Sequence, residues 1–250
     1  MGLRMIDALH ALRLQIEWGA DEALGAEPRD RRRALPDVGI TPVPARAAPA
    51  PAPAPAPATA SYATSEEIDD ALRATGGAGL AITAQHFVGV RGRPDAAVLI
   101  IGDCPGEAEE RSGVAFSGEP GRLLAIMLGS AGIGLDDCAF GYMVPWRPPG
   151  GRPPTDVEIA VCAPFTLARL ALRPPRVVLP CGAGVVRALL GPTAGARSRG
   201  RLLLAPISGA DPLACLVLQA PEQAMASARG KAQAWLTIRL LRRTIPMAPT

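Results

Sequence analysis

Histidine, lysine and aromatic residues are scarce in this sequence of 250 residues, and cysteines are few. The only histidines, His10 and His86, lie far apart along the chain, which excludes a histidine-rich metal site. The five cysteines include no Cys-x-x-Cys pair, and an odd number without close pairs argues against a disulfide framework or a zinc ribbon. We expect Cys138, Cys181 and Cys215, which stand inside apolar runs, to be buried thiols.

Long hydrophobic runs are also missing. No uninterrupted apolar stretch approaches the roughly 20 residues that a membrane helix needs. The first 25 residues carry four acidic side chains and lack the apolar centre of a signal peptide. At the same time, 48% of the residues are hydrophobic, which argues against a mainly disordered chain. We therefore expect a soluble, cytoplasmic and monomeric protein without a membrane partner, made of one sizeable domain and an appendage.

Charge is divided unevenly along the chain. Residues 65–161 carry a net charge of −7 and residues 162–250 a net charge of +10, while the first 64 residues are balanced and the whole chain has +3. A basic half of this kind is compatible with a polyanionic partner such as DNA. Because nearly all the cations are arginine, with Lys231 the single lysine, a solvated arginine-rich surface explains the charge about equally well.

Three regions follow one another along the sequence. Residues 1–30 contain a predicted helix over residues 5–18, with apolar side chains on one stripe and Gly19 as its stop. Residues 31–64 form a Pro/Ala-rich linker, whose alternating prolines favour an extended, semi-rigid spacer. Residues 65–250 form the predicted main domain.

Within the main domain, short apolar runs alternate with amphipathic segments. The apolar runs predict buried strands at residues 98–102, 139–144, 176–181 and 213–219. The segments between and after them predict helices at residues 121–131, 155–172, 183–190 and 222–243, the second opening on a capping box of Thr155 and Glu158. This alternation is typical of an α/β fold with three α/β/α layers around a central four-stranded parallel sheet. Ligands of such sheets bind at the carboxyl ends of the strands, which selects the loops at residues 103–118, 145–152, 182–184 and 220–223.

Those loops have recognisable sequences. GDCPGEAEERSGVAFSGEPG follows the first predicted strand, PWRPPGGRPPT follows the second, and CGAGVVRALLG follows the third. They resemble, in type, order and spacing, the loops of family 4 uracil-DNA glycosylases, and the resemblance covers residues 79–243. The helix ending in WGADEALG and the following linker are also similar to bacterial members. The resemblance implies a glycosylase-like fold and a base-excision-repair enzyme, a hydrolase that flips uracil out of DNA and cleaves its N-glycosidic bond.

The resemblance also implies roles for individual residues. Phe116 falls on the phenylalanine that stacks on uracil, and Asp103 on the acidic residue that helps to place the attacking water. Cys104, in the same turn as Asp103, falls among the substrate-binding positions. Glu109, Glu110 and Arg111 match an acidic-acidic-Arg run in the family, and we expect them on a solvated loop face.

Two positions depart from the family pattern. The asparagine that reads the uracil edge is replaced by Tyr142, whose phenol would fill the pocket. The histidine after the fourth strand is replaced by Ala220, which cannot donate a hydrogen bond to uracil. Since these groups recognise the base and stabilise the departing anion, we expect catalysis to be weak or lost.

The family's iron–sulfur cluster is not expected here. Of its four cysteine positions only Cys162 is retained, Trp146 stands at another, and no cysteine precedes the first predicted strand. One thiolate cannot hold a cluster that takes four ligands. The sequence therefore predicts a protein without a metal or other cofactor.

Groups suited to DNA are better preserved. Arginines bracket the rigid Pro-Pro-Gly-Gly turn, glycines open a helix whose N–H groups suit a phosphate, and further arginines follow. The predicted DNA-binding residues are Arg147, Arg152, Gly182, Gly184, Arg199 and Arg201.

Two hypotheses about function remain. One is a glycosylase acting on uracil in DNA, supported by Asp103, Phe116 and the phosphate-facing loops. The other is an inactive nucleic-acid-binding or protein-interaction module on the same fold, supported by Tyr142 and Ala220. A nucleotide-binding flavodoxin-like protein fits less well, because the proline-rich loops have too few consecutive glycines for a phosphate nest.

Overall fold

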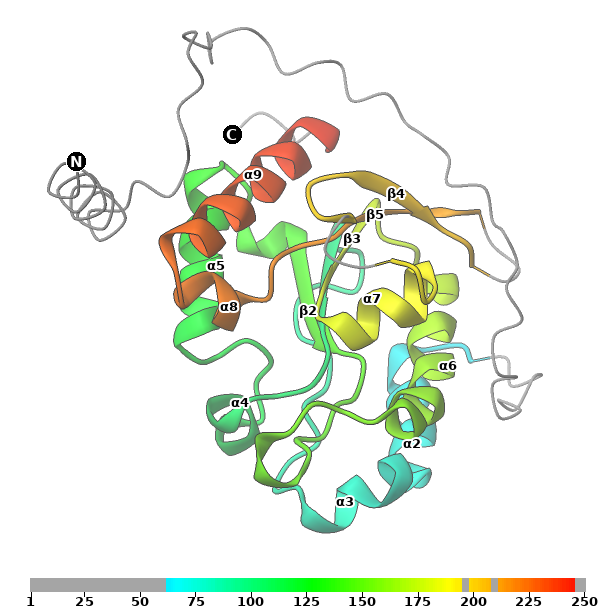
Figure 1. The fold of residues 1–250 in the computed structure, drawn as a ribbon. Helices are drawn as coiled ribbons and strands as arrows, with labels where there is room; N and C mark the ends of the chain where they lie inside the picture. Colours follow the sequence, from blue (N-terminus) through cyan, green and yellow to red (C-terminus); the bar gives the residue numbers. More distant parts are fainter. Residues whose placement is uncertain (1–61, 195–197, 208–210, 246–250) are drawn as a thin grey trace, which may run out of the picture. The chain divides into compact units, whose positions relative to one another are not determined.

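One five-stranded sheet organises the part of the chain that the computed structural model describes, residues 62–194, 198–207 and 211–245 (Figure 1). The strand order is β2-β1-β3-β5-β4, in which β1, β2, β3 and β5 are parallel and β4 runs antiparallel to β5. The strands are β1 (Val98–Gly102), β2 (Cys138–Tyr142), β3 (Val177–Cys181), β4 (Leu202–Ala205) and β5 (Leu213–Leu216). The predicted four-stranded parallel sheet is confirmed, and each of its strands starts within one residue of the predicted position.

The antiparallel edge strand was not predicted. β4 has only four residues and follows an arginine-rich segment, so its short apolar run carries little periodicity. It pairs with β5 along its whole length, from Leu202 opposite Leu216 to Ala205 opposite Leu213. The central sheet is therefore larger by one strand than the sequence suggested.

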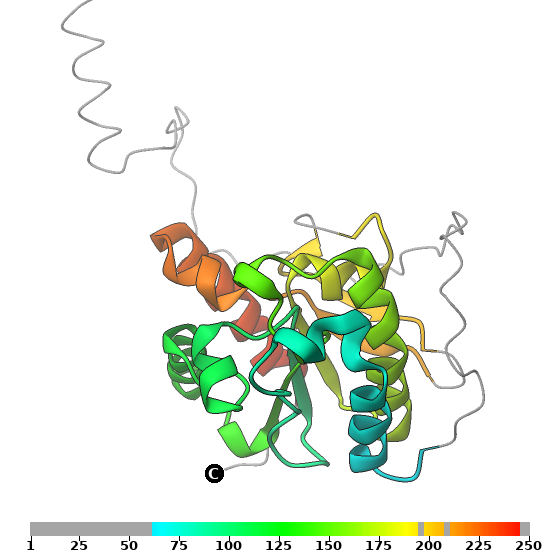
Figure 2. The same ribbon diagram turned by 90° about the horizontal axis from the view of Figure 1, so that it is seen from below.

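Helices cover both faces of the sheet and make three layers (Figure 2). Along β1, Val98 and Ile100 point into one buried core, and Leu99 and Ile101 point into the other. The first core is closed by α5 (Glu119–Ser130), α8 (Pro221–Met225) and α9 (Ala228–Thr244), and the second by α2 (Ser65–Ala74), α3 (Leu80–Thr83), α6 (Asp156–Leu172) and α7 (Ala183–Leu190). Burial on both faces explains why the strands read as continuous apolar runs.

The remaining elements lie in the loops. They are helix α4 (Glu107–Ser112) and the 3-10 turns η1 (Gly76–Gly79), η2 (Leu135–Asp137) and η3 (Pro149–Gly151). Helices α2, α3 and α4 were not predicted. The predicted helix at residues 222–243 is divided in two, because Ser227 leaves the helical conformation and its hydroxyl accepts the N–H of Gly230 to cap α9.

Three further expectations concern membrane spans, the N-terminal regions and the burial of cysteines. Within the described residues, no helix is both long enough and apolar enough to span a membrane. The predicted N-terminal helix and nearly all of the predicted linker lie outside the described residues. The expected burial of Cys138, Cys181 and Cys215 is confirmed, since each is at most 4% exposed.

Candidate functional site

Four predicted site residues meet at the carboxyl edge of the sheet. Tyr142 ends β2, Asp103 follows β1, Gly182 follows β3, and Ala220 precedes α8 beyond β5. The ends of three neighbouring strands are in register, with Gly102 of β1 opposite both Tyr142 of β2 and Cys181 of β3. The parallel sheet thus brings together loops that are distant in sequence, as the strand pattern predicted.

The rings of Phe116 and Tyr142 are stacked on each other. Their centroids lie 5.0 Å apart with an angle of 7° between the ring planes, and the two side chains are 5% and 9% exposed. The Tyr142 hydroxyl also accepts a hydrogen bond from the backbone N–H of Phe116, with 3.2 Å between nitrogen and oxygen. The phenol therefore lies against the aromatic ring on which the family resemblance places a flipped uracil.

Small residues around this pair make the stacking possible. A Cβ atom on Gly102 would lie 2.9 Å from the Tyr142 ring, and one on Gly121 would lie 2.0 Å from the carbonyl oxygen of Phe116. Phe116 itself has a φ of 52°, in the left-handed region that non-glycine residues rarely occupy. Burial, with Glu109 nearby, raises the pKa of the Tyr142 phenol, so the hydroxyl stays neutral.

Asp103 is held by the start of α7. Its Oδ1 accepts the N–H of Val185 at 2.7 Å, and its carboxylate lies against Gly182 and Gly184, where side chains would collide with it. A carboxylate at a helix N-terminus is stabilised by the helix dipole. Gly182 and Gly184 thus lie at the sheet edge as predicted. The start of α7, however, already binds the Asp103 carboxylate of the chain itself.

The two arginines of the Pro-Pro-Gly-Gly turn are each paired with a carboxylate. Arg147 lies 3.0 Å from Glu110, and Arg152 forms two hydrogen bonds with Glu158, at 2.6 and 2.9 Å. The sequence placed both arginines on the turn around η3 but did not anticipate these partners. Their charges are balanced within the protein, which weakens them as predicted phosphate ligands.

The expected solvated loop face after β1 was wrong for Glu109 and Glu110, whereas Arg111 of the same run is exposed as expected. Glu109 is only 6% exposed, and its Oε1 accepts the N–H of Gly118 at 3.0 Å. Glu110 joins the Arg147 side chain to the backbone N–H of Gln85. The two carboxylates fix the loop that carries Phe116, a role that became visible only once the unpredicted helix α4 had turned them inward.

The positions beside Asp103 and in the fourth loop contain no charged donor. Cys104 is half-buried, and burial, with Asp103 adjacent, raises the pKa of its thiol to about 12, so it stays protonated. Ala220 is the N-cap of α8 and makes no side-chain hydrogen bond. In the first turn of that helix, desolvation by surrounding protein atoms and the nearby Glu109 and Asp103 raise the pKa of Glu222.

An open cleft adjoins Asp103 on the β5 side. It has a volume of about 190 Å³ and lies between the start of α7, residues 217–218 after β5, and the start of α8. Among the predicted DNA-binding residues, Gly182 and Arg199 line it. Arg187, which the sequence analysis had not singled out, also lines it and is paired with Asp156 at 3.0 Å. Arg201 is exposed in the same segment as Arg199.

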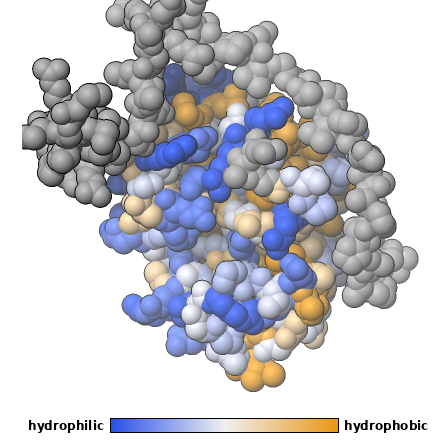
Figure 3. All heavy atoms as spheres, in the orientation of Figure 1, coloured by the Kyte–Doolittle hydropathy of each residue, from blue (hydrophilic) through white to orange (hydrophobic). Residues whose placement is uncertain are grey.

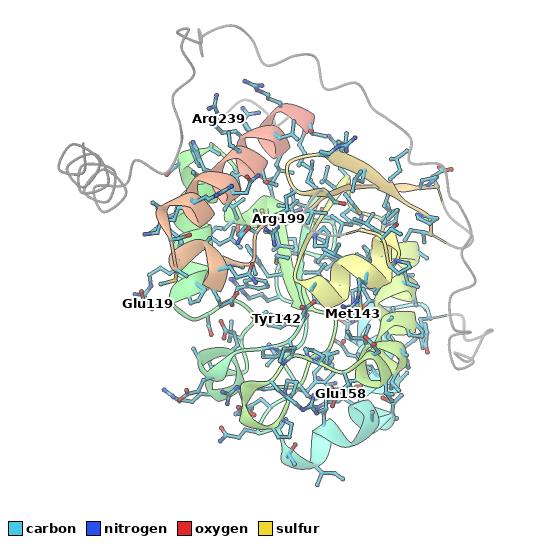
Figure 4. All side chains as sticks on the ribbon, viewed as in Figure 1. Glu119, Tyr142, Met143, Glu158, Arg199 and Arg239 are labelled. Carbon is cyan, nitrogen blue, oxygen red and sulfur yellow. The ribbon has the colours of Figure 1, made fainter. Side chains whose placement is uncertain are left out.

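The cations of α9 do not line this cleft. This helix carries Arg229, Lys231, Arg239, Arg242 and Arg243, all exposed, and no acidic residue. Arg239 lies toward the end of α9 that is remote from Tyr142 (Figure 4). Hydrophilic side chains are spread over much of the face seen in Figure 3, including the region of α5 and α8. The basic half of the sequence therefore does not form one continuous face around the site.

The residues at the family's cluster positions do not fit an iron–sulfur cluster. Trp146 is 3% exposed, and its indole packs edge-on against Phe87 at 5.2 Å and fills the space beside Gly77, where a Cβ atom would lie 2.5 Å from the ring. Cys162 is fully buried in the same core, where burial raises the pKa of its thiol to about 12. A protonated thiol and an indole are not cluster ligands. In the described part of the chain, no three His, Cys, Asp or Glu side chains are grouped so as to hold a metal ion.

We expect the Arg152–Glu158 pair to make stability depend on pH in acid. The hydrogen bonds from Arg152 and from the backbone of Thr155 lower the pKa of Glu158 from 4.5 to about 2. The stabilisation is complete above about pH 4.5 and is lost as the pH falls toward 2, because the carboxyl is protonated first in the unfolded chain. Urea unfolding of Glu158→Gln should show a smaller fall in the free energy of unfolding over this range. Asp156→Asn is the control: it removes the exposed partner of Arg187 from the same helical turn, and it should change the free energy of unfolding by no more than about 1 kcal/mol.

A comparison with known protein families identifies the superfamily of this chain. The model of the uracil DNA glycosylase superfamily matches residues 90–241, which is more than half of the chain. The chain belongs to this superfamily.

Individual relatives agree with the family 4 resemblance. The chain is 37% identical over 92 residues to the Type-4 uracil-DNA glycosylase of Thermotoga maritima, covering 37% of this chain and 48% of the relative. It is 31% identical to the Type-4 uracil-DNA glycosylases of Pyrobaculum aerophilum, over 93 residues (37% and 47%), and of Archaeoglobus fulgidus, over 100 residues (40% and 50%). The chain thus spans about half the length of the curated relatives it matches. The predicted resemblance is confirmed.

Proposed function

We propose that this chain is a DNA-binding member of the uracil-DNA glycosylase superfamily in which the excision of uracil is very weak or lost. The single observation that carries the proposal is the stacking of Tyr142 on Phe116, at 5.0 Å and 7°. A flipped uracil would need this ring face, and the phenol is fixed there by burial and by its hydrogen bond to the Phe116 backbone. Excision therefore requires Tyr142 to leave a packed position first.

The fourth loop supports the same proposal. Cleavage of the N-glycosidic bond leaves a uracil anion, and a fixed hydrogen-bond donor aimed at that charge typically supplies a factor of about a hundred to a thousand in rate. Ala220 offers only a methyl group at this position. Asp103 keeps a carboxylate at the edge, able to hold a water, but water activation alone does not replace recognition of the base and stabilisation of the leaving group.

The proposal is tested by assaying the full chain on single- and double-stranded oligonucleotides that contain one uracil. We expect a single-turnover rate at least about a thousandfold below that of the Thermotoga maritima relative under matched conditions. A rate comparable to that of the relative would refute the loss of catalysis.

DNA binding itself should depend on the arginine of the cleft. Replacing Arg199, which lines the cleft, by alanine should lower the slope of log affinity against log salt by about one, because one phosphate contact is removed. The slope is measured by fluorescence anisotropy with a labelled duplex of undamaged sequence. Arg122→Ala removes an exposed arginine that is already paired with Glu119 on α5, and it is the matched control.

The same titration decides between a nucleic-acid-binding and a protein-interaction module. If the natural chain shows no binding at low salt, or an affinity independent of salt, the proposed DNA partner is wrong. A protein-interaction module would then be favoured.

A further inference from the structure

We propose that the exposed face of α9 is a docking surface for an acidic segment of a partner protein, in which carboxylates flank one apolar side chain. The inference goes beyond the proposed function and does not depend on the state of the base pocket. It is argued from the juxtaposition of unpaired cations and a half-exposed leucine on one face of a helix.

The first step is the charge of this face. Five exposed cations lie on a helix that contains no acidic residue: Arg229, Lys231, Arg239, Arg242 and Arg243. None of the five takes part in the ion pairs found within the described residues. The helix dipole favours cations in the last turn but disfavours them in the first, where Arg229 stands. An anionic partner, unlike the dipole, accounts for positive charge at both ends of α9.

The second step is the apolar side chain in the middle of the charged face. Leu236 is 49% exposed and stands seven residues from both Arg229 and Arg243, about two helical turns each way, so the three share one face. At 1.5 Å per residue, each arginine lies roughly 10 Å along the helix from the leucine. A phosphate backbone offers no apolar surface to a leucine, whereas a peptide can bring an apolar side chain together with carboxylates. The pattern therefore favours an acidic protein segment over DNA.

The third step is the position of this face relative to the cleft. A Cβ atom on Gly132, in the turn that leads into β2, would lie 3.7 Å from Nε of Arg242. The C-terminal end of α9 is thus at the amino edge of the sheet, opposite the edge that holds the cleft. The inner side chains of α9, among them Ile238 and Leu241, are buried in the core and fix which residues face outward. Because no residue of α9 lines the cleft, the chain can hold a protein segment and DNA at the same time.

The experiment measures binding of the full chain to labelled synthetic peptides by fluorescence anisotropy, at a physiological salt concentration of about 0.15 M. The first peptide has about a dozen residues, with a central leucine and aspartates about three residues away on each side, which spans roughly 10 Å in an extended chain. The second has alanine at the centre, and the third keeps the leucine but has asparagine in place of aspartate. We expect the first to bind at least about fivefold more tightly than the second, because it buries apolar surface against Leu236. The third should not bind.

Variants of α9 make the test specific. Arg239→Glu should weaken binding of the first peptide at least about fivefold, because it removes an attraction and adds a repulsion. Arg111→Glu, the same change at an exposed arginine of α4, is the matched control and should stay within about twofold of the natural chain. Leu236→Ala should weaken binding of the leucine peptide but not of the alanine peptide, a coupling that charge alone does not produce. Circular dichroism shows that each variant is folded.

Two results would overturn the inference. One is equal affinity for the leucine and alanine peptides, and the other is an affinity that neither Arg239→Glu nor Leu236→Ala changes. Tighter binding of a single-stranded oligonucleotide of the same net charge, weakened by Arg239→Glu and unaffected by Leu236→Ala, would also overturn it and identify α9 as a nucleic-acid surface. Uracil excision by the natural chain would refute the proposed function and leave this inference standing.

Discussion

Uracil excision should increase by about a hundred- to a thousandfold when Tyr142→Asn is combined with Ala220→His, relative to the natural chain. The first change vacates the ring face of Phe116, and the second places a hydrogen-bond donor at the N-cap of α8, where the leaving uracil would carry its charge. Asp103 stays unchanged in this variant. Its carboxylate is already held by the N–H of Val185. Single-turnover excision of uracil from a labelled oligonucleotide measures the effect.

Each single variant is the control for the double one. Tyr142→Asn alone opens the pocket but leaves the anion without its donor, and Ala220→His alone supplies a donor to a blocked pocket. Both should therefore remain within about tenfold of the natural chain. If the double variant is folded and binds DNA yet gains no activity, the filled pocket and missing donor are not what limits excision.

Trp146→Ala should lower the free energy of unfolding by about 3–5 kcal/mol, the usual cost of truncating a buried tryptophan. The indole is 3% exposed and joins Gly77 of η1 to Phe87 and the core beneath α6, so its removal leaves a cavity where the segment before β1 meets the proline-rich loop. Urea unfolding at neutral pH measures the change.

Two further measurements serve as controls for the effect of Trp146→Ala. Ile82→Ala, at a side chain 88% exposed on α3, should change stability by no more than about 0.5 kcal/mol. Iron analysis of the natural chain should find no stoichiometric metal, because the position of Trp146 is occupied by a packed ring. A small effect of Trp146→Ala together with bound iron would contradict the structural role given to the indole.

The sequence predicted the parallel sheet well because a strand buried on both faces leaves a continuous apolar run. It also placed Asp103, Phe116, Tyr142 and Ala220 at one edge, because the loops that follow parallel strands lie at the same edge of a sheet. It did not predict β4, since four residues carry too little pattern and the strand is specified by its pairing with β5.

Side-chain partners were the least predictable part of the site. Glu158 was recognised as a capping residue, and the capping box is present, yet its carboxylate also binds Arg152 from the preceding loop. Glu110 pairs with Arg147, which is 37 residues away in the sequence. Asp103 accepts the N–H of Val185, which is 82 residues away. Such pairs depend on how loops fold over one another, which local propensity and spacing do not encode.

The cations at the far end of α9 give a polyanion a second place to bind, besides the cleft. On the proposed function, DNA drawn to the cleft finds Arg187 and Arg199, whereas DNA drawn to the region of Arg239 is held by charge alone. A titration at low salt therefore measures the sum of two populations of complex. Since raising the salt depletes the purely ionic population first, the share of complexes formed at the cleft should rise as total affinity falls.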